Sequence, residues 1–145
     1  MTIYTMGFAQ KDAQTFFNLI SKNNIEILID VRLNNRSQLA GFTKGKDLAY
    51  FLKEICHCEY SHMLGFAPTK AILDGYKKGT IDWNEYTVQY NALIKERKAR
   101  KLFEKSFGKY ERVLFLCSEP TPEMCHRRLL AEYMQECLGC DIRHI

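Results

Sequence analysis

Two short runs of almost uninterrupted apolar residues, at positions 25–31 and 113–116, restrict the fold of this chain more than any other feature. Apart from Glu26 and Asp30, the first run has the pattern of a strand that is covered on both faces, and so does Val113-Leu114-Phe115-Leu116. Such strands are typical of parallel sheets, whose crossover connections place helices on both faces. The chain is therefore predicted to be an α/β protein.

Helical patterns alternate with these strands. A helix is predicted after Asp12, and another where apolar residues repeat at helical spacing over 48–55. A third begins at Asp82, which forms a capping box with Glu85, and a fourth runs from Thr121 and Pro122 to about Leu138, where Gly139 ends it. Further short strands are expected at 3–6, 59–62 and 141–145. We predict one domain over residues 1–145, a three-layer, doubly wound and mostly parallel sheet of about five strands with helices on both faces.

Composition is that of an ordinary globular protein. Of the 145 residues, 46% are hydrophobic and 26% are charged. No apolar run approaches the roughly 18 residues that a membrane helix needs, and the N-terminus lacks the layout of a signal peptide. We therefore expect a soluble, cytoplasmic protein without a membrane partner. In that compartment the six cysteines are expected to be reduced thiols rather than a disulfide framework.

Positive charge is concentrated in one segment. The formal net charge is +4, and the stretch from Lys95 to Arg112 holds eight basic and three acidic residues. This stretch is interpreted either as the solvated face of a helix or as a patch that attracts phosphate or nucleic acid. The aromatic stripe that includes Tyr86 and Tyr90 has the same ambiguity between a packed core and a base-stacking platform.

Ligands of open parallel sheets bind beyond the carboxyl ends of the strands. At these ends the sequence places Gly7, then Asp30 and Arg32, then Cys117 and Glu119. The helix that follows carries Cys125, His126 and Arg127 near its start. The glycine-rich nucleotide-binding loops and the nucleophile elbow of hydrolases are not present in the sequence.

Cys125 and His126 can each be chemical or structural. A helix N-terminus and Arg127 both favour a thiolate at Cys125, whereas a buried cysteine is often only a packing residue. His126 lies at the centre of the apolar face of its predicted helix and therefore points toward the sheet. It is either a general acid or base or a buried ring that is hydrogen-bonded to a backbone carbonyl.

Asp30 and Arg32 share one face of the predicted second strand. Arg32 can bind a carboxylate or phosphate through paired hydrogen bonds, or it can form a structural pair with Asp30. Arg36 and Ser37 lie just downstream and could extend an anion site.

Short motifs follow in order along nearly the whole chain: Ile-Tyr-Thr-Met-Gly at 3–7, Asp-Val-Arg at 30–32, Leu-Gly at 64–65, Leu-Cys-Ser-Glu at 116–119, Cys-His-Arg at 125–127 and a final Ile-Arg-His-Ile. Together they resemble the family catalogued as domain of unknown function 488, and the pairing of Leu-Cys-x-Glu with Cys-His-Arg is the most specific part. The resemblance implies a fold and a site and names no activity. The chain departs from the family pattern at Phe8 and Ala9, where the family has His and Ser, and at Phe66, where it has Gly.

Two functional hypotheses follow. In the first, the protein is an enzyme for an anionic small molecule or nucleotide, with Cys125, His126 and Cys117 as catalytic residues and with Arg32, Arg127, Asp30 and Glu119 binding the substrate. In the second it is a binding module without catalysis. That module would hold zinc or iron through Cys117, Glu119, Cys125 and His126, or nucleic acid through the basic segment. The sequence specifies no cofactor and no oligomeric state.

Overall fold

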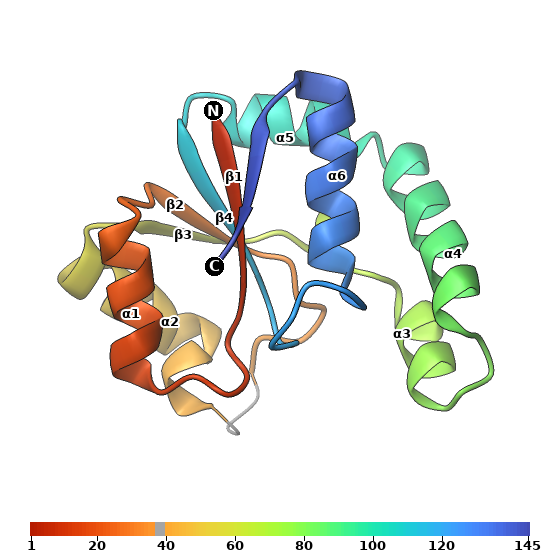
Figure 1. Cartoon of the computed structure of the whole chain (residues 1–145), viewed down its shortest axis with the longest axis horizontal. Helices are drawn as coiled ribbons and strands as arrows, with labels where there is room; N and C mark the ends of the chain where they lie inside the picture. The colour runs from red at the N-terminus through yellow and green to blue at the C-terminus, as the bar shows by residue number, and fades with distance from the viewer. Residues whose placement is uncertain (37–39) are drawn as a thin grey trace.

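The fold is built on a five-stranded sheet in which every pair of neighbouring strands is parallel. A computed structural model describes residues 1–36 and 40–145, and Figure 1 shows the whole chain. The order across the sheet is β3-β2-β4-β1-β5, with strands β1 (Thr2–Gly7), β2 (Ile27–Asp30), β3 (Glu59–His62), β4 (Arg112–Cys117) and β5 (Asp141–His144). The predicted α/β class and the predicted doubly wound parallel sheet are confirmed.

Helices cover both faces of this sheet (Figure 1). They are α1 (Ala13–Lys22), α2 (Gly45–Phe51), α3 (Lys70–Lys77), α4 (Trp83–Glu96), α5 (Ala99–Phe107) and α6 (His126–Leu138). Short 3-10 turns occupy Gly41–Thr43 and Leu64–Phe66, and a π turn at Leu52–Cys56 extends α2. Side chains of α1 and α2 pack on one face of the sheet, and those of α4, α5 and α6 pack on the other.

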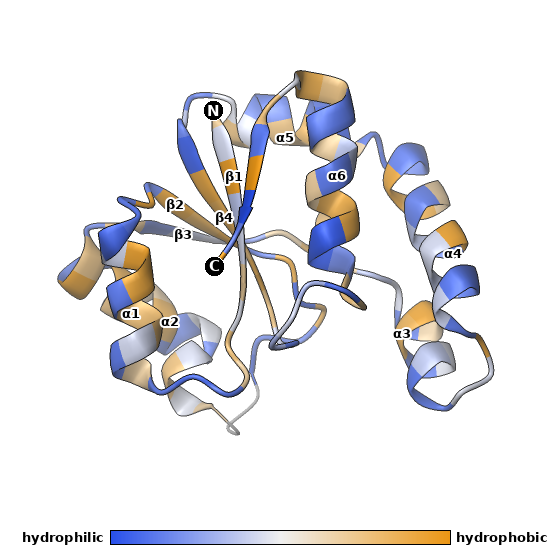
Figure 2. Ribbon diagram, viewed as in Figure 1, coloured by the Kyte–Doolittle hydropathy of each residue, from blue (hydrophilic) through white to orange (hydrophobic). Residues whose placement is uncertain are grey.

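Alternation along the central strands divides the core between the two faces. On β4, Val113 and Phe115 join the cluster under α4, α5 and α6, whereas Leu114 and Leu116 join the cluster under α1 and α2. This is the arrangement expected of a strand that is covered on both sides. Figure 2 shows β2 and β4 as largely apolar and the edge strand β3 as polar. No helix in the described part of the chain is long and apolar enough to cross a membrane.

The helix boundaries follow local capping where a side chain can reach the free backbone groups. Asp12 and Asp82 each accept a hydrogen bond from a backbone N–H in the first turn, at 2.8 Å, as predicted. The Glu85 carboxylate accepts from the Gln89 side chain and does not complete the predicted capping box. Gly139 ends α6 with φ of 66°, a left-handed conformation that glycine adopts without strain.

The predicted start of α6 was wrong. The helix begins at His126, with Cys125 in the N-cap position, and not at Thr121 and Pro122. The Arg128 guanidinium turns back and donates hydrogen bonds to the carbonyls of Pro122 and Glu123, at 3.1 and 2.8 Å. Residues 121–124 are thereby held in a turn, and His126 becomes the first residue of the helix.

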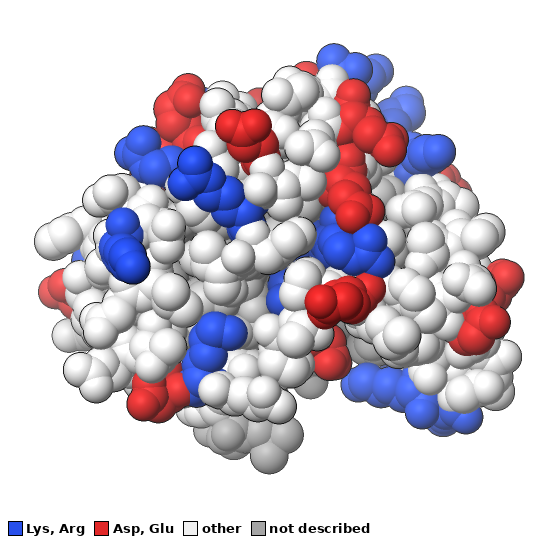
Figure 3. Space-filling model, in the orientation of Figure 1, with Lys and Arg blue, Asp and Glu red and all other residues white. Residues whose placement is uncertain are grey.

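The basic segment from Lys95 to Arg112 is not one helix. Lys98 has φ of 56°, a left-handed conformation that separates helix α4 from helix α5. Arg112 already belongs to β4. Arg97 donates to the carbonyls of Leu64, Gly65 and Ala67, and Arg112 donates to that of Asn24. Several of these cations therefore bind the protein itself. In Figure 3 basic and acidic side chains alternate over the visible face.

Removal of the α4 cap should measure its contribution. Asp82→Ala is expected to lower the free energy of unfolding by about 1 kcal/mol, because the Glu85 N–H loses its acceptor. Asp82→Asn keeps a side-chain acceptor and should retain most of the stability. Urea unfolding followed by circular dichroism measures both variants, and equal stabilities for them would contradict the capping account.

Candidate functional site

A single pocket of about 510 Å³ lies at the carboxyl edge of the sheet. The end of β4, the start of α6, the loop after β2 and residues of α3 and α4 contribute to its lining. Five of the residues singled out in the sequence line it together: Arg32, Cys117, Glu119, Cys125 and His126. Asp30 and Arg127 are buried beside it and do not line it. The volume is in the range of small-molecule sites, about 300–1,000 Å³.

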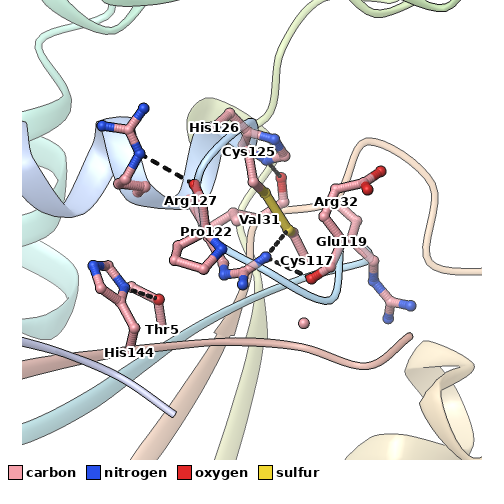
Figure 4. The surroundings of a disulfide bond; sticks show 12 residues. Thr5, Val31, Arg32, Cys117, Glu119, Pro122, Cys125, His126, Arg127 and His144 are labelled. Carbon is pink, nitrogen blue, oxygen red and sulfur yellow. Dashed lines mark hydrogen bonds between the residues drawn. A yellow bond between two sulfur atoms is a disulfide. The ribbon is translucent and has the colours of Figure 1, made fainter. Parts of the chain in front are cut away.

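The sulfur atoms of Cys117 and Cys125 are joined in a disulfide (Figure 4). The expectation that all six cysteines are free thiols therefore fails for this pair, whereas Cys56, Cys58, Cys137 and Cys140 are free. Cys117 is the last residue of β4, and Cys125 precedes the first residue of α6. The short turn between them brings the sulfurs together.

Arg127 lies directly against this sulfur pair. Its guanidinium donates to the Cys117 Sγ at 3.0 Å and to the Glu119 carbonyl at 2.7 Å (Figure 4). The side chain is 1% exposed, and its Nε has no hydrogen-bond partner. Burial lowers the pKa of Arg127 to about 10, so the group carries its charge at neutral pH. No carboxylate in the described part of the chain lies within ion-pair distance of it.

Gly7 provides the space for this arrangement. It ends β1 opposite Cys117, and a Cβ atom placed there would lie 1.5 Å from the Glu119 carbonyl oxygen and 3.1 Å from the Arg127 guanidinium. Only glycine lets the loop after β4 approach β1 so closely. The helices that follow β1 and β4, α1 and α6, pack on opposite faces of the sheet, so this contact lies at the topological switch point.

His126 is a neutral hydrogen-bonded ring. Its Nε2 lies 2.8 Å from the Val31 carbonyl oxygen, which can only accept, so Nε2 carries the proton and Nδ1 has the free lone pair. Burial lowers the pKa of His126 to about 4, and the positive charge of Arg127 contributes to this shift. At neutral pH the ring can therefore accept a hydrogen bond through Nδ1 and does not act as a proton donor there.

Arg32 is paired with Asp30 in a buried ion pair. Its Nε and one terminal nitrogen donate to the two Asp30 oxygens at 2.8 and 2.7 Å, and the Thr43 carbonyl accepts at 2.6 Å. Tyr60 also donates to Asp30. Arg32 and Asp30 are 5% and 0% exposed. This pair anchors the loop after β2, and little of the guanidinium is left for a ligand.

Phe8, at the position where the resemblance implies histidine, covers this arginine, with the Arg32 guanidinium carbon 5.3 Å from the centre of the ring. An apolar ring thus stands where an imidazole was implied. Arg36, expected to extend an anion site, is exposed, and its backbone N–H donates to the Asn34 side chain. Ser37, the other such residue, lies outside the described residues.

Aromatic side chains line the same pocket as the sulfur pair, and of these the sequence analysis had considered only Tyr86 for a ligand contact. Tyr76 from α3 and Trp83 and Tyr86 from α4 all line it. For Tyr86 and Tyr90 the sequence left a packed core and a base-stacking platform open; both side chains are buried, and Tyr86 also lines the pocket. The apolar spacing along α4 does not reveal that Tyr86 is both a core residue and a pocket residue. Only tertiary packing brings α3 and the loop between Cys117 and Cys125 next to α4.

The described residues contain no group of three or more His, Cys, Asp or Glu side chains arranged to hold a metal ion. Cys117, Glu119, Cys125 and His126 share the pocket, but the two sulfurs bond to each other and His126 Nε2 bonds to Val31.

The model of the family described as Domain of unknown function DUF488 matches residues 12–134 of the chain. The match covers most of the sequence and includes α1, β2, β4 and the start of α6. It confirms the resemblance inferred from the motifs. No curated protein and no solved structure shows significant similarity to the chain.

The close approach at Gly7 can be tested directly. Gly7→Ala should lower the free energy of unfolding by about 1–3 kcal/mol or more, because the new methyl group overlaps the backbone at Glu119. Gly41→Ala is the matched control, since a Cβ there has no neighbour within 4 Å. Thermal and urea unfolding compare the two variants. A Gly7→Ala protein as stable as Gly41→Ala would mean that the loop after β4 does not press on β1.

Proposed function

Because the chain belongs to the DUF488 family, whose description names no reaction, we propose a function from the pocket itself: a thiol-dependent oxidoreductase. Cys117 is the attacking thiolate and Cys125 is the resolving thiol. The observation that carries this proposal is the contact between the buried Arg127 guanidinium and the Cys117 sulfur, at 3.0 Å.

A buried cation without a paired carboxylate stabilises any negative charge that forms beside it. In the reduced protein that charge is the Cys117 thiolate, and a neighbouring arginine lowers a thiol pKa. The contact favours Cys117 over Cys125 as the nucleophile, although both had been candidates. Cys125 stands in the N-cap position of α6, and no side-chain capping bond holds it there.

The proposed reaction reduces a small disulfide or hydroperoxide, written X–Y. The Cys117 thiolate attacks X, the X–Y bond breaks, and Y leaves with a proton. The Cys125 thiol then attacks the Cys117 sulfur, loses its proton to the leaving X, and forms the Cys117–Cys125 disulfide. Together the two thiols and X–Y give one disulfide, HX and HY. A low-molecular-weight thiol reductant returns the pair to the reduced state.

The buried arginines have supporting roles in this proposal. Arg32 directs its donors to Asp30 and Thr43, and one terminal nitrogen of Arg127 donates to the Cys117 sulfur and the Glu119 carbonyl. In this proposal both arginines therefore shape the pocket and set its potential, and neither is assigned to clamp an anion. His126 offers the Nδ1 lone pair to a donor on the substrate, because Nε2 is bound to Val31. Its low pKa keeps this acceptor available at neutral pH.

The pH dependence of alkylation tests the thiolate. In the reduced protein, the rate at which iodoacetamide modifies Cys117, measured by peptide mass spectrometry, should have a midpoint at least about one unit below the value of about 8.5 for free cysteine. Arg127→Met should raise this midpoint by about one unit or more. Arg100→Met removes an exposed cation that pairs with Glu104 on α5 and should leave it unchanged. A wild-type midpoint near 8.5 would overturn the proposal, whether or not the Arg127 variant folds.

The order of the two cysteines can be read from a trapped intermediate. Reduced protein treated with one equivalent of cystine should end with the intramolecular Cys117–Cys125 disulfide, and two cysteine molecules should be released. Cys125→Ser should instead accumulate a mixed disulfide on Cys117, whereas Cys117→Ser should react much more slowly at Cys125. Intact-protein and peptide mass spectrometry distinguish these products. Faster trapping on Cys125 would reverse the assigned roles, and no mixed disulfide on either residue would contradict the reaction.

A further inference from the structure

Three of the residues that line the pocket form a connected group of aromatic rings. Trp83 and Tyr86 are stacked, with centroids 4.9 Å apart and planes at 18°. Tyr76 packs against both, at 5.7 and 5.3 Å. All three rings line the pocket.

This array passes from core to pocket along α4. At its inner end Tyr90 is fully buried, stacks on Tyr86, and donates its hydroxyl to the Phe66 carbonyl. At its outer end Tyr76 and Trp83 are only half-buried. Core packing explains the inner rings. Core packing does not explain why Tyr76 and Trp83 extend the array to the pocket, since part of each ring there stays exposed to water.

Met124 connects these rings to the loop that carries the cysteines. Its side chain is 58% exposed, its sulfur accepts a hydrogen bond from the Tyr76 hydroxyl at 3.4 Å, and it also lines the pocket. Met124 directly precedes Cys125. The aromatic rings and the sulfur pair therefore line one pocket, and a thioether, which packs favourably against aromatic rings, lies at the junction.

Polar groups lie on the side of the pocket nearest the sulfurs. His126, whose Nδ1 carries no proton, lines the pocket, and so do Ser118 and Glu119, whose side chains carry a hydroxyl and a carboxylate. A ligand that satisfies both sides must have a flat apolar face for the rings and N–H or O–H groups on its edge. A saturated apolar ligand would leave the acceptors unpaired, and a sugar alone would leave the aromatic surface in water.

We propose that this pocket binds a planar heteroaromatic ring of the nucleobase type, with its face on Tyr76, the Trp83 ring inclined beside it, and its polar edge toward His126 and Glu119. This assignment names the substrate class of the thiol site and, in that respect, rests on the proposed function. The electrophilic group of the substrate is then a substituent of such a ring, held beside Cys117. Binding of the ring itself requires no reaction of the sulfur atoms.

Trp83 is the only tryptophan in the chain, so its fluorescence reports on the pocket. Adenosine and uridine, used as probes, should quench it in a saturable manner in a Cys117→Ser/Cys125→Ser double variant, and ribose at the same concentrations should not. Calorimetric titration of the same variant gives the affinity without relying on the fluorescence. No saturable binding of either nucleoside by both methods would overturn the proposal, and so would equal binding of ribose.

Variants at Tyr76 locate the binding surface. Tyr76→Leu should weaken nucleoside binding about tenfold, because a stacking ring is lost, whereas Tyr76→Phe removes only the hydroxyl and should bind nearly as wild type. Tyr50→Leu is the matched control, since Tyr50 is 59% exposed on α2 and does not line this pocket. Wild-type affinity in Tyr76→Leu, with the fold intact by circular dichroism, would place the ligand elsewhere and contradict the assignment.

The two proposals fail separately. Nucleoside binding to the cysteine-free pocket, together with a Cys117 alkylation midpoint near that of free cysteine, would support the ring site and overturn the oxidoreductase. A depressed Cys117 midpoint together with an absence of nucleoside binding would support the thiol chemistry and overturn the ring site.

Discussion

The position of one buried cation, the Arg127 guanidinium, organises the carboxyl edge of the sheet. It contacts the sulfur at the end of β4 and the carbonyl of Glu119 in the loop that follows, and the absence of a side chain at Gly7 lets that loop lie against β1. Removing a guanidinium from water is costly unless acceptors and negative charge replace the solvent. Here one acceptor is a carbonyl, and the other is the Cys117 sulfur, which the proposed reaction makes anionic on reduction. In that proposal structure and reactivity depend on the same contact.

Arg32 has a comparable place on the other side of the pocket, but its charge is satisfied differently. Asp30 accepts from Arg32 through both oxygens, and Thr43 adds further acceptors. The positive charge of Arg32 is therefore neutralised by Asp30, and the pair holds the loop after β2. The contrast between the two arginines is the reason that the proposed chemistry is assigned to one side of the pocket. Arg32 has its carboxylate, whereas Arg127 has only the sulfur and a carbonyl. The chemistry is expected where the charge is left without its carboxylate.

Much of the fold was predictable because it depends on short-range patterns. The apolar runs of β2 and β4 required cover on both faces, and the Asp12 and Asp82 caps act on N–H groups three residues away. Errors arose where a side chain bonded to backbone carbonyls outside its own helix. The Arg128 side chain donates to the carbonyls of Pro122 and Glu123, and α6 begins only after this turn, at His126. Arg97 donates to the carbonyl of Gly65, 32 residues away, next to Lys98, where α4 and α5 are separated. Neither contact leaves a periodic signal.

The sequence by itself determined the parallel sheet, the ends of its strands and therefore the group of residues that meets at its carboxyl edge, because period and capping are local properties of the chain. Only the tertiary structure decided how those residues are used. It pairs Arg32 with Asp30, directs Arg127 to Cys117, bonds Cys117 to Cys125, and ties His126 to Val31. It also brings Tyr76 and Trp83, from two different helices, into the lining of the pocket that holds the sulfurs. Hydrogen-bond partners and facing surfaces depend on distances between segments that are remote in the chain, and residue type and spacing do not contain those distances.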